Sequence, residues 1–306
     1  MMPISILSAI LLSAATGLIL TLFIRYLSMK NPYEPLNSAQ GNPCHPTDAR
    51  VDINGFAQRL AELIQIPTVS WTNRSKRDAS VLSQFQEALI TLYPRVHATL
   101  KREVHGNFGL IYHWKGKTPG RQPVLFLAHF DVVPAEEQGE ETWTEPPFSG
   151  KIENGILWGR GTLDIKSQLA FQMEAAEILL GRGWQPDRDI YFAYGGDEEI
   201  AGTEGAQNMA AVFRERGLTF EFVMDEGGVI AQDHLAFLKG QPAALIGLAE
   251  KGIVTFKITS PGESGHSSMP GRDGTAIERL ARGIVRLEEK KFSSRLDPVM
   301  QNMLER

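Results

Sequence analysis

The chain has 306 residues, of which 42% are hydrophobic and 22% are charged, the ordinary balance of a globular protein. Its formal net charge is -5 and its pI is near 5.9, which argues against the basic stripe of a nucleic-acid-binding surface, so we expect no nucleic-acid partner. Cys44 is the only cysteine, which excludes an intrachain disulfide and a cysteine-ligated zinc site. Any bound metal must therefore be held by His, Asp and Glu, which suits zinc or a similar divalent ion.

The first 24 residues contain no charged side chain, and Arg25 and Lys30 follow them. About 20 apolar residues suffice to cross a bilayer, so we predict a membrane anchor helix over residues 1–27. A cleavable signal peptide normally begins with basic residues, and a buried globular helix rarely scatters Ser and Gly through an uncharged run. We therefore expect a membrane-anchored protein, on a side of the membrane that one short basic flank leaves open. Residues 28–49 are rich in Pro and Asn and are predicted to be a linker.

Beyond the linker, the apolar pattern alternates between strands and helices. A continuous apolar run at 124–129 is typical of a strand covered on both faces, and the mainly apolar segments 189–194 and 220–224 are also predicted to be buried strands. The alternation predicts an α/β fold over residues 50–246, with a mostly parallel sheet and helices on both faces. The other expected elements are strands at 108–114 and 155–158 and helices at 51–66, 78–92, 166–180 and 203–216, with Thr203 as the N-cap of the last.

After Gly247 the pattern changes. Residues 253–259 alternate between apolar and polar side chains, which predicts a half-exposed strand, and a helix is expected at 276–289. We interpret residues 247–306 as the start of an α+β lid domain. About sixty residues with one clear strand and one helix cannot close a core of their own, so we expect this domain to be partial.

Four acidic or histidine clusters each follow a predicted strand, at spacings of roughly 25 to 35 residues that suit one strand–helix–strand crossover. The carboxyl ends of parallel strands open onto one edge of a sheet, so we expect the clusters to meet there. The clusters are His129 with Asp131, then Asp164, then Glu198 with Glu199, and finally Asp225.

Each cluster taken alone has a simpler interpretation. His129 and Asp131 share a strand face, so the carboxylate can orient the imidazole of a zinc ligand, or the pair can be an ordinary buried contact. Asp164 could be a helix N-cap. The preceding Gly159-x-Gly161 resembles the start of a dinucleotide-binding fingerprint, but Asp164 occupies the third glycine position and would repel a pyrophosphate. A nucleotide site is therefore excluded.

The remaining clusters are rich in like charges. Glu198 and Glu199 adjoin Asp197 in a Gly-rich loop, which is either solvated or holds a cation, because three carboxylates repel one another strongly. Asp225 could simply end a strand at a turn. Together, one His and at least three carboxylates at one sheet edge favour a two-metal centre, with a further carboxylate free to act as general base.

Five short motifs follow one another in a fixed order between residues 64 and 289. They are His129-Phe-Asp131-Val-Val-Pro134, Gly159-Arg-Gly-Thr-Leu-Asp164, Asp197-Glu198-Glu199, Asp225-Glu-Gly-Gly228, and the Gly- and Ser-rich segment 262–270 around His266. This ordered set resembles the M20 metallopeptidase family, and within it carboxypeptidase S and the N-acyl-amino-acid hydrolases.

The resemblance assigns a role to each site residue. It implies that His129 and Asp225 bind one zinc, that Glu199 binds the other, and that Asp164 bridges the two. It also implies that Asp131 orients His129 and that Glu198 is the general base. His266 would stabilise an oxyanion, often in the active site of a partner subunit, so the resemblance implies a homodimer formed through the complete lid domain.

The implied activity is metal-dependent hydrolysis of an amide bond next to a free carboxylate, in a small peptide or an N-acyl amino acid. The family's last zinc ligand is a late histidine, but no histidine follows His266 in this chain. One of the two expected zinc sites then keeps only Asp164 and Glu199, and we expect the chain to be C-terminally truncated.

The alternative is a truncated, non-catalytic fragment that acts as a membrane-tethered metal- or ligand-binding domain. A two-metal phosphoesterase is less favoured, because the Glu198-Glu199 pair and the His266 motif fit amide hydrolysis.

Overall fold

The structure, a computed structural model, covers most of the chain beyond residue 50. The chain divides into two compact units, residues 1–52 and 53–306. The predicted anchor and linker lie outside the described residues, and none of the helices that the structure describes is long and apolar enough to span a membrane. The described residues are 51–106, 108–135, 143–232, 242–248, 252–262, 265–266, 268, 274–291, 293, 295, 298 and 301.

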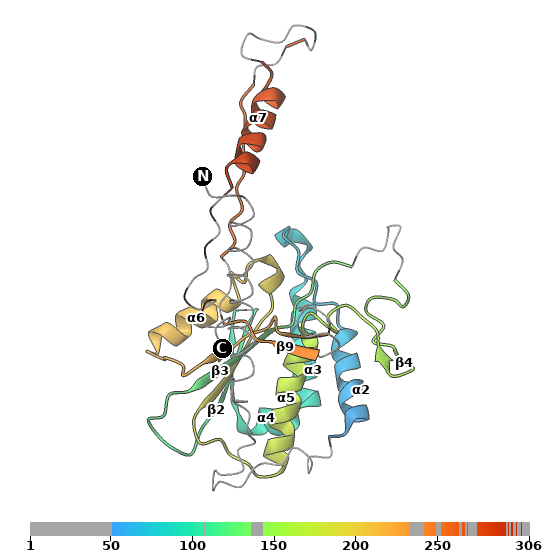
Figure 1. Cartoon of the computed structure of the whole chain (residues 1–306). Coiled ribbons are helices and arrows are strands. Elements are labelled where there is room, and N and C mark those ends of the chain that lie inside the picture. Colours follow the sequence, from blue (N-terminus) through green and yellow to red (C-terminus); the bar gives the residue numbers. More distant parts are fainter. Residues whose placement is uncertain are drawn as a thin grey trace, which may run out of the picture. The chain divides into compact units, whose positions relative to one another are not determined.

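A five-stranded sheet with the order β1-β2-β6-β3-β7 forms the centre of the second unit (Figure 1). β2 is antiparallel to both of its neighbours, whereas β6, β3 and β7 run parallel to one another. All strands except β2 therefore point the same way, and the predicted α/β fold with a mostly parallel sheet is confirmed. The strands are β1 (Lys101–His105), β2 (Gly109–Trp114), β3 (Val124–His129), β6 (Ile190–Gly195) and β7 (Val223–Met224).

Two small hairpins accompany this sheet, one on the path to Asp164 and one after β7. They are β4 (Ile152–Glu153) with β5 (Ile156–Leu157), and β8 (Val229–Gln232) with β9 (Pro242–Leu245). The described helices are α2 (Ile53–Ile64), α3 (Ala79–Leu92), α4 (Pro94–Thr99), α5 (Lys166–Gly181), α6 (Ala206–Glu215) and α7 (Ala276–Glu289), with short 3-10 turns η2 (Arg74–Lys76) and η3 (Glu198–Ile200).

The helices cover both faces of the sheet (Figure 1). On one face, α2, α3, α4 and α5 enclose the larger core, in which the Phe85 and Phe130 rings stack with centroids 4.9 Å apart. On the other face, α6 packs Phe213 against Ile111 and Tyr191. Because both faces of β2, β3 and β6 are covered, these strands consist of nearly continuous apolar runs, as expected for buried strands.

The strand observed in the region 220–224 is shorter and more exposed than predicted. Only Val223–Met224 forms a strand, and both side chains are 52% exposed rather than buried. β7 is the edge of the sheet and pairs with β3 alone among the described strands. An apolar run indicates the capacity to be buried, but burial also requires a neighbouring element.

The strand predicted at 253–259 is also absent. Residues 252–262 have no strand structure, and Phe256 is 78% exposed. A strand is stabilised by a hydrogen-bonded neighbour, and the described residues provide none for this segment. The following helix does form as predicted: α7 spans Ala276–Glu289, and its first turn is closed by a capping box between Thr275 and Glu278.

Helix α6 begins later than predicted. It starts at Ala206 and not at Thr203, and its N-cap is Gly205. The carboxylate of Asp197 accepts hydrogen bonds from the backbone amides of Glu204 (2.7 Å) and Gly205 (2.9 Å). These amides have no partner within the helix, so a fully buried Asp197 satisfies the helix start in place of Thr203.

Lowering the pH is expected to reduce the free energy of unfolding through the ion pair between Glu103 in β1 and Arg216 just after α6. Hydrogen bonds from Arg216 and Lys101 outweigh burial and lower the pKa of Glu103 from 4.5 to about 2. A carboxyl with a lowered folded-state pKa contributes stability above its unfolded pKa, and this contribution is lost as the pH falls from about 4.5 to about 2. Glu103→Gln should therefore reduce the loss of stability on acidification by up to about 1 kcal/mol, because the ion pair is partly exposed. Urea unfolding at pH 6 and pH 3 tests this, with Glu215→Gln as the control; equal acid sensitivity in both variants would contradict it.

Candidate metal centre

The predicted clusters do converge at one edge of the sheet. His129 is the last residue of β3, and its register partner in β6 is Gly195, shortly before the turn that carries Glu198. Asp164 lies just before α5, and Glu226 follows β7 by two residues. All of these positions border one cavity of about 1030 Å³, so the carboxyl ends of the parallel strands bring together side chains up to about a hundred residues apart.

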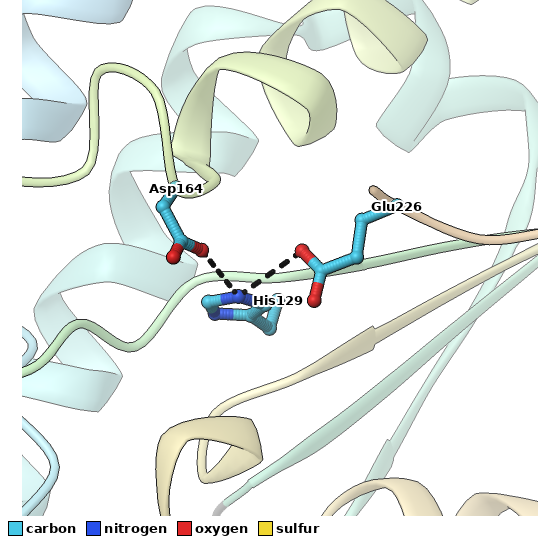
Figure 2. A group of neighbouring side chains, drawn as sticks. All are labelled: His129, Asp164 and Glu226. Carbon is cyan, nitrogen blue, oxygen red and sulfur yellow. Dashed lines mark hydrogen bonds and ion pairs between the residues drawn. The ribbon is translucent and has the colours of Figure 1, made fainter. Parts of the chain in front are cut away.

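His129 lies at the middle of the cluster, with only 2% of its surface exposed. Its Nε2 atom is 3.1 Å from an Asp164 oxygen, 3.3 Å from a Glu226 oxygen and 3.7 Å from a Glu198 oxygen. Figure 2 shows the carboxylates of Asp164 and Glu226 converging on the imidazole from opposite sides. One ligand atom from each of these three residues lies within 4.8 Å of the others, which is the spacing of groups that can share a metal ion.

The second nitrogen of His129 faces Asp131. Nδ1 lies 3.0 Å from the Asp131 backbone oxygen and 3.3 Å from its carboxylate. Asp131 is fully buried, and its carboxylate also accepts hydrogen bonds from the backbone amides of Glu198 and Glu199, both at 3.1 Å. The Ser70 hydroxyl donates a fourth contact at 2.5 Å. One carboxylate thus fixes both the imidazole and the start of η3.

The cluster is strongly acidic. Burial by itself lowers the pKa of His129, but the carboxylates of Asp131 and Glu226 outweigh burial and raise it to about 11. Burial raises the pKa of Glu198, which nearby carboxylates raise further while His129 lowers it. Burial likewise raises the pKa of Glu199, and the charge of Asp164 adds to that increase.

Such a cluster favours a cation. Two like charges 4 Å apart repel by about 4 kcal/mol at an effective dielectric constant of about 20, and a single imidazolium cannot neutralise several carboxylates. A divalent ion in contact with them would remove most of this repulsion. The available donors are one imidazole nitrogen and carboxylate oxygens, a set that suits zinc or another borderline-hard divalent ion. The residues present therefore fit a metal centre.

The other predicted site residues lie in different settings. Asp225 is exposed and borders the same cavity as Glu226, and Glu199 is half-buried. Asp197, the first acid of its cluster, is turned away from the cavity toward the start of α6. His266 is exposed, with its Nδ1 atom 2.7 Å from the Ser268 hydroxyl. Its predicted contribution to the site stays a prediction.

Two residues of this centre were not predicted. Glu226 is adjacent to the predicted Asp225. The two neighbouring acids after a predicted strand were the sequence feature that could have indicated Glu226 as a second candidate ligand. Ser70 follows α2 and has no distinguishing pattern around it in the sequence. Only its position in the fold, next to the buried carboxylate of Asp131, shows what it does.

The fold and the site define an α/β domain with a cluster of side chains that could hold a metal ion, and comparison with known proteins identifies the family. Residues 125–297 match peptidase family M20/M25/M40, and the chain belongs to this family. It is 39% identical to the N-fatty-acyl-amino acid synthase/hydrolase PM20D1 of Bos taurus, over 76% of this chain and 45% of that protein.

Two further relatives bear carboxypeptidase names. The chain is 38% identical to the probable carboxypeptidase S-like 2 of Dictyostelium discoideum, over 79% of this chain and 46% of that protein. It is 36% identical to carboxypeptidase S of Saccharomyces cerevisiae, over 78% of this chain and 42% of that protein. The chain thus spans a little under half the length of the relatives that it matches.

The neighbouring acids Asp225 and Glu226 can be told apart by metal affinity. The structure directs Glu226 at His129, so Glu226→Gln should weaken zinc binding by at least about tenfold. Competition titration against a chromophoric chelator measures this, with Asp225→Asn as the matched comparison. A loss of affinity confined to Asp225→Asn would assign the ligand to Asp225, as the family resemblance implies.

Proposed function

We propose that this chain carries the metal-binding part of a hydrolase that cleaves an amide bond next to a free carboxylate. The observation that carries the proposal is the buried His129, whose Nε2 atom lies within 3.3 Å of two carboxylates at the wall of an open cavity. Membership of the M20 family supports metal-dependent amide hydrolysis in general. The substrate and the mechanism below are our proposals.

The metal centre would be formed by the residues that the sequence singled out. His129 would bind one zinc together with a carboxylate of the Asp225–Glu226 pair, Glu199 would bind a second zinc, and Asp164 would bridge them. Bound metal would supply a Lewis acid that polarises the substrate carbonyl and lowers the pKa of water. The imidazole is pre-oriented for this by Asp131 on its other nitrogen, and that carboxylate is itself held by Ser70.

Glu198 is the proposed general base. Its side chain is half exposed in the cavity, 3.7 Å from His129, while its backbone amide is held by Asp131. It would take the proton from the attacking water and pass it to the leaving amine. Burial raises the pKa of Glu198. A raised pKa favours the protonated carboxyl, which would hold the proton after it leaves the water and before it reaches the amine.

The proposed substrates are small peptides or N-acyl amino acids. The relatives support this class, since their names describe an N-fatty-acyl-amino acid hydrolase and carboxypeptidases. His266 would stabilise the oxyanion and the complete lid would form a homodimer, as the resemblance implies. The uncharged first 24 residues support a membrane anchor for the domain.

A second candidate function is a non-catalytic metal- or ligand-binding domain. It is favoured by one observation: among the described residues, the one group whose ligand atoms all lie within 4.8 Å of one another is His129, Asp164 and Glu226, and Glu199 is not part of it. A catalytic zinc normally has three protein ligands, so this group would hold one ion rather than the two of the proposed enzyme. Activity of the chain itself distinguishes the two candidates.

The proposed reaction predicts a requirement for both a metal and a free substrate carboxylate. The 306-residue chain, loaded with zinc, should hydrolyse an N-acyl amino acid and should not hydrolyse the corresponding N-acyl amino acid amide. Activity should disappear on chelation and return when zinc is added back. Metal content by elemental analysis, measured alongside, gives the stoichiometry. Bound zinc without any hydrolysis would support the binding domain instead.

The general-base assignment predicts a separation of binding from turnover. Glu198→Ala should keep zinc affinity within about threefold, while kcat falls by roughly 100- to 10,000-fold, because the base contributes to proton transfer. Glu215→Gln, on the outer side of α6, is the control and should retain activity. Normal turnover by Glu198→Ala would refute the assignment.

A further inference from the structure

Lys166 is fully buried, although a lysine normally reaches solvent. It is the first residue of α5 and has 0% exposure. Its Nζ atom donates hydrogen bonds to the backbone oxygens of Leu63 (3.0 Å) and Ile66 (2.6 Å), at and just beyond the end of α2. The Leu63 oxygen also accepts from the Ile66 amide and the Ile66 oxygen from the Thr68 amide, so the amine adds a second hydrogen bond to each oxygen and ties the end of α2 to the start of α5.

The α2 end that Lys166 holds leads directly into the metal centre. After Ile66 the chain passes through Thr68, whose hydroxyl donates to the Phe130 oxygen, and through Ser70, whose hydroxyl donates to Asp131. The backbones of Thr68 and Ser70 also hydrogen-bond to Val132. The segment after α2 therefore supports the loop that contains Asp131 and follows His129.

Lys166 also lies next to the loop that carries Asp164. It follows Asp164 by two residues, and its side chain packs against Gly161 in that loop. A Cβ atom at Gly161, where φ is +94°, would lie 3.0 Å from Val132 and 3.2 Å from the Lys166 side chain. The loop that carries Asp164 thus lies against both the Lys166 stem and the loop after β3.

We propose that Lys166 is a positioning residue, which fixes Asp164 relative to His129 and Asp131 by anchoring the start of α5 to the end of α2. The inference rests on the metal centre proposed above and adds a residue that touches neither metal nor substrate. A buried amine requires hydrogen-bond partners, so an apolar residue would fill this space at lower cost. What the amine adds is two directed bonds between the segments that carry the ligands.

The chain offers a matched control for this inference. Arg59 in α2 makes a two-pronged contact with Glu174 in α5, at 2.9 and 2.6 Å. It links the same two helices as Lys166, but it does so between the middle of α2 and the middle of α5, whereas Lys166 acts at the start of α5 and the end of α2. Removing it should loosen the two helices without moving the ligands.

The test compares the 306-residue chain with its Lys166→Met and Arg59→Met variants. Zinc affinity is measured by competition with a chromophoric chelator, and the visible spectrum of the cobalt-loaded protein reports the ligand geometry. Urea unfolding of the metal-free proteins gives the stability of each. Lys166→Met should bind zinc 10- to 100-fold more weakly and change the cobalt spectrum. Arg59→Met should stay within about twofold in affinity and keep the spectrum, even where it loses as much stability.

Each outcome decides the inference. Unchanged affinity and spectrum in Lys166→Met would overturn it while leaving the metal centre in place. An unsubstituted 306-residue chain that binds neither zinc nor cobalt would overturn the metal centre itself, and the role of Lys166 with it. Should Lys166→Met fail to fold, Lys166→Gln retains an amide donor and should show an intermediate loss. Failure of both variants to fold would mean that Lys166 serves only the stability of the core.

Discussion

The site depends on a single buried carboxylate, that of Asp131. It has no exposed surface, lies beside the His129 imidazole, and accepts hydrogen bonds from Ser70 and from the amides of Glu198 and Glu199. A buried charge is tolerated only when it is fully hydrogen-bonded, so the loops that meet at Asp131 cannot move independently. The ends of β3 and β6 and the segment after α2 are thereby held in one arrangement.

This arrangement separates two kinds of acidic residue whose roles cannot be distinguished from the sequence alone. The carboxylates of Asp131 and Asp197 accept hydrogen bonds from backbone amides and so stabilise the fold. Asp164, Glu198 and Glu226 border the cavity and share the single His129 imidazole as an ion-pair partner. The first kind shapes the site, and the second kind is left available for a cation and for proton transfer.

Much of this could be predicted from the sequence, because it depends on local pattern and on one topological rule. The run 124–129 matches β3 residue for residue, and α7 matches its predicted bounds. The convergence of His129, Asp164 and the Glu198 loop followed from the edge rule for parallel strands. Predictions failed where a contact outside the local pattern decides: Asp197 starts α6 in place of Thr203, and β7 has no covering element among the described residues. Strand β1, whose charged residues show no apolar run, was missed because its pairing with β2 stabilises it.

The exposed edge at β7 has a practical consequence. Val223 and Met224 of β7, and Phe222 just before it, are about half exposed, and the outer side of β7 has no partner among the described strands. An open edge with apolar side chains is a template for pairing with a further chain, and natural proteins usually protect such edges with charge, proline or a covering segment. By this rule, a lysine placed on this edge would act as a gatekeeper against aggregation.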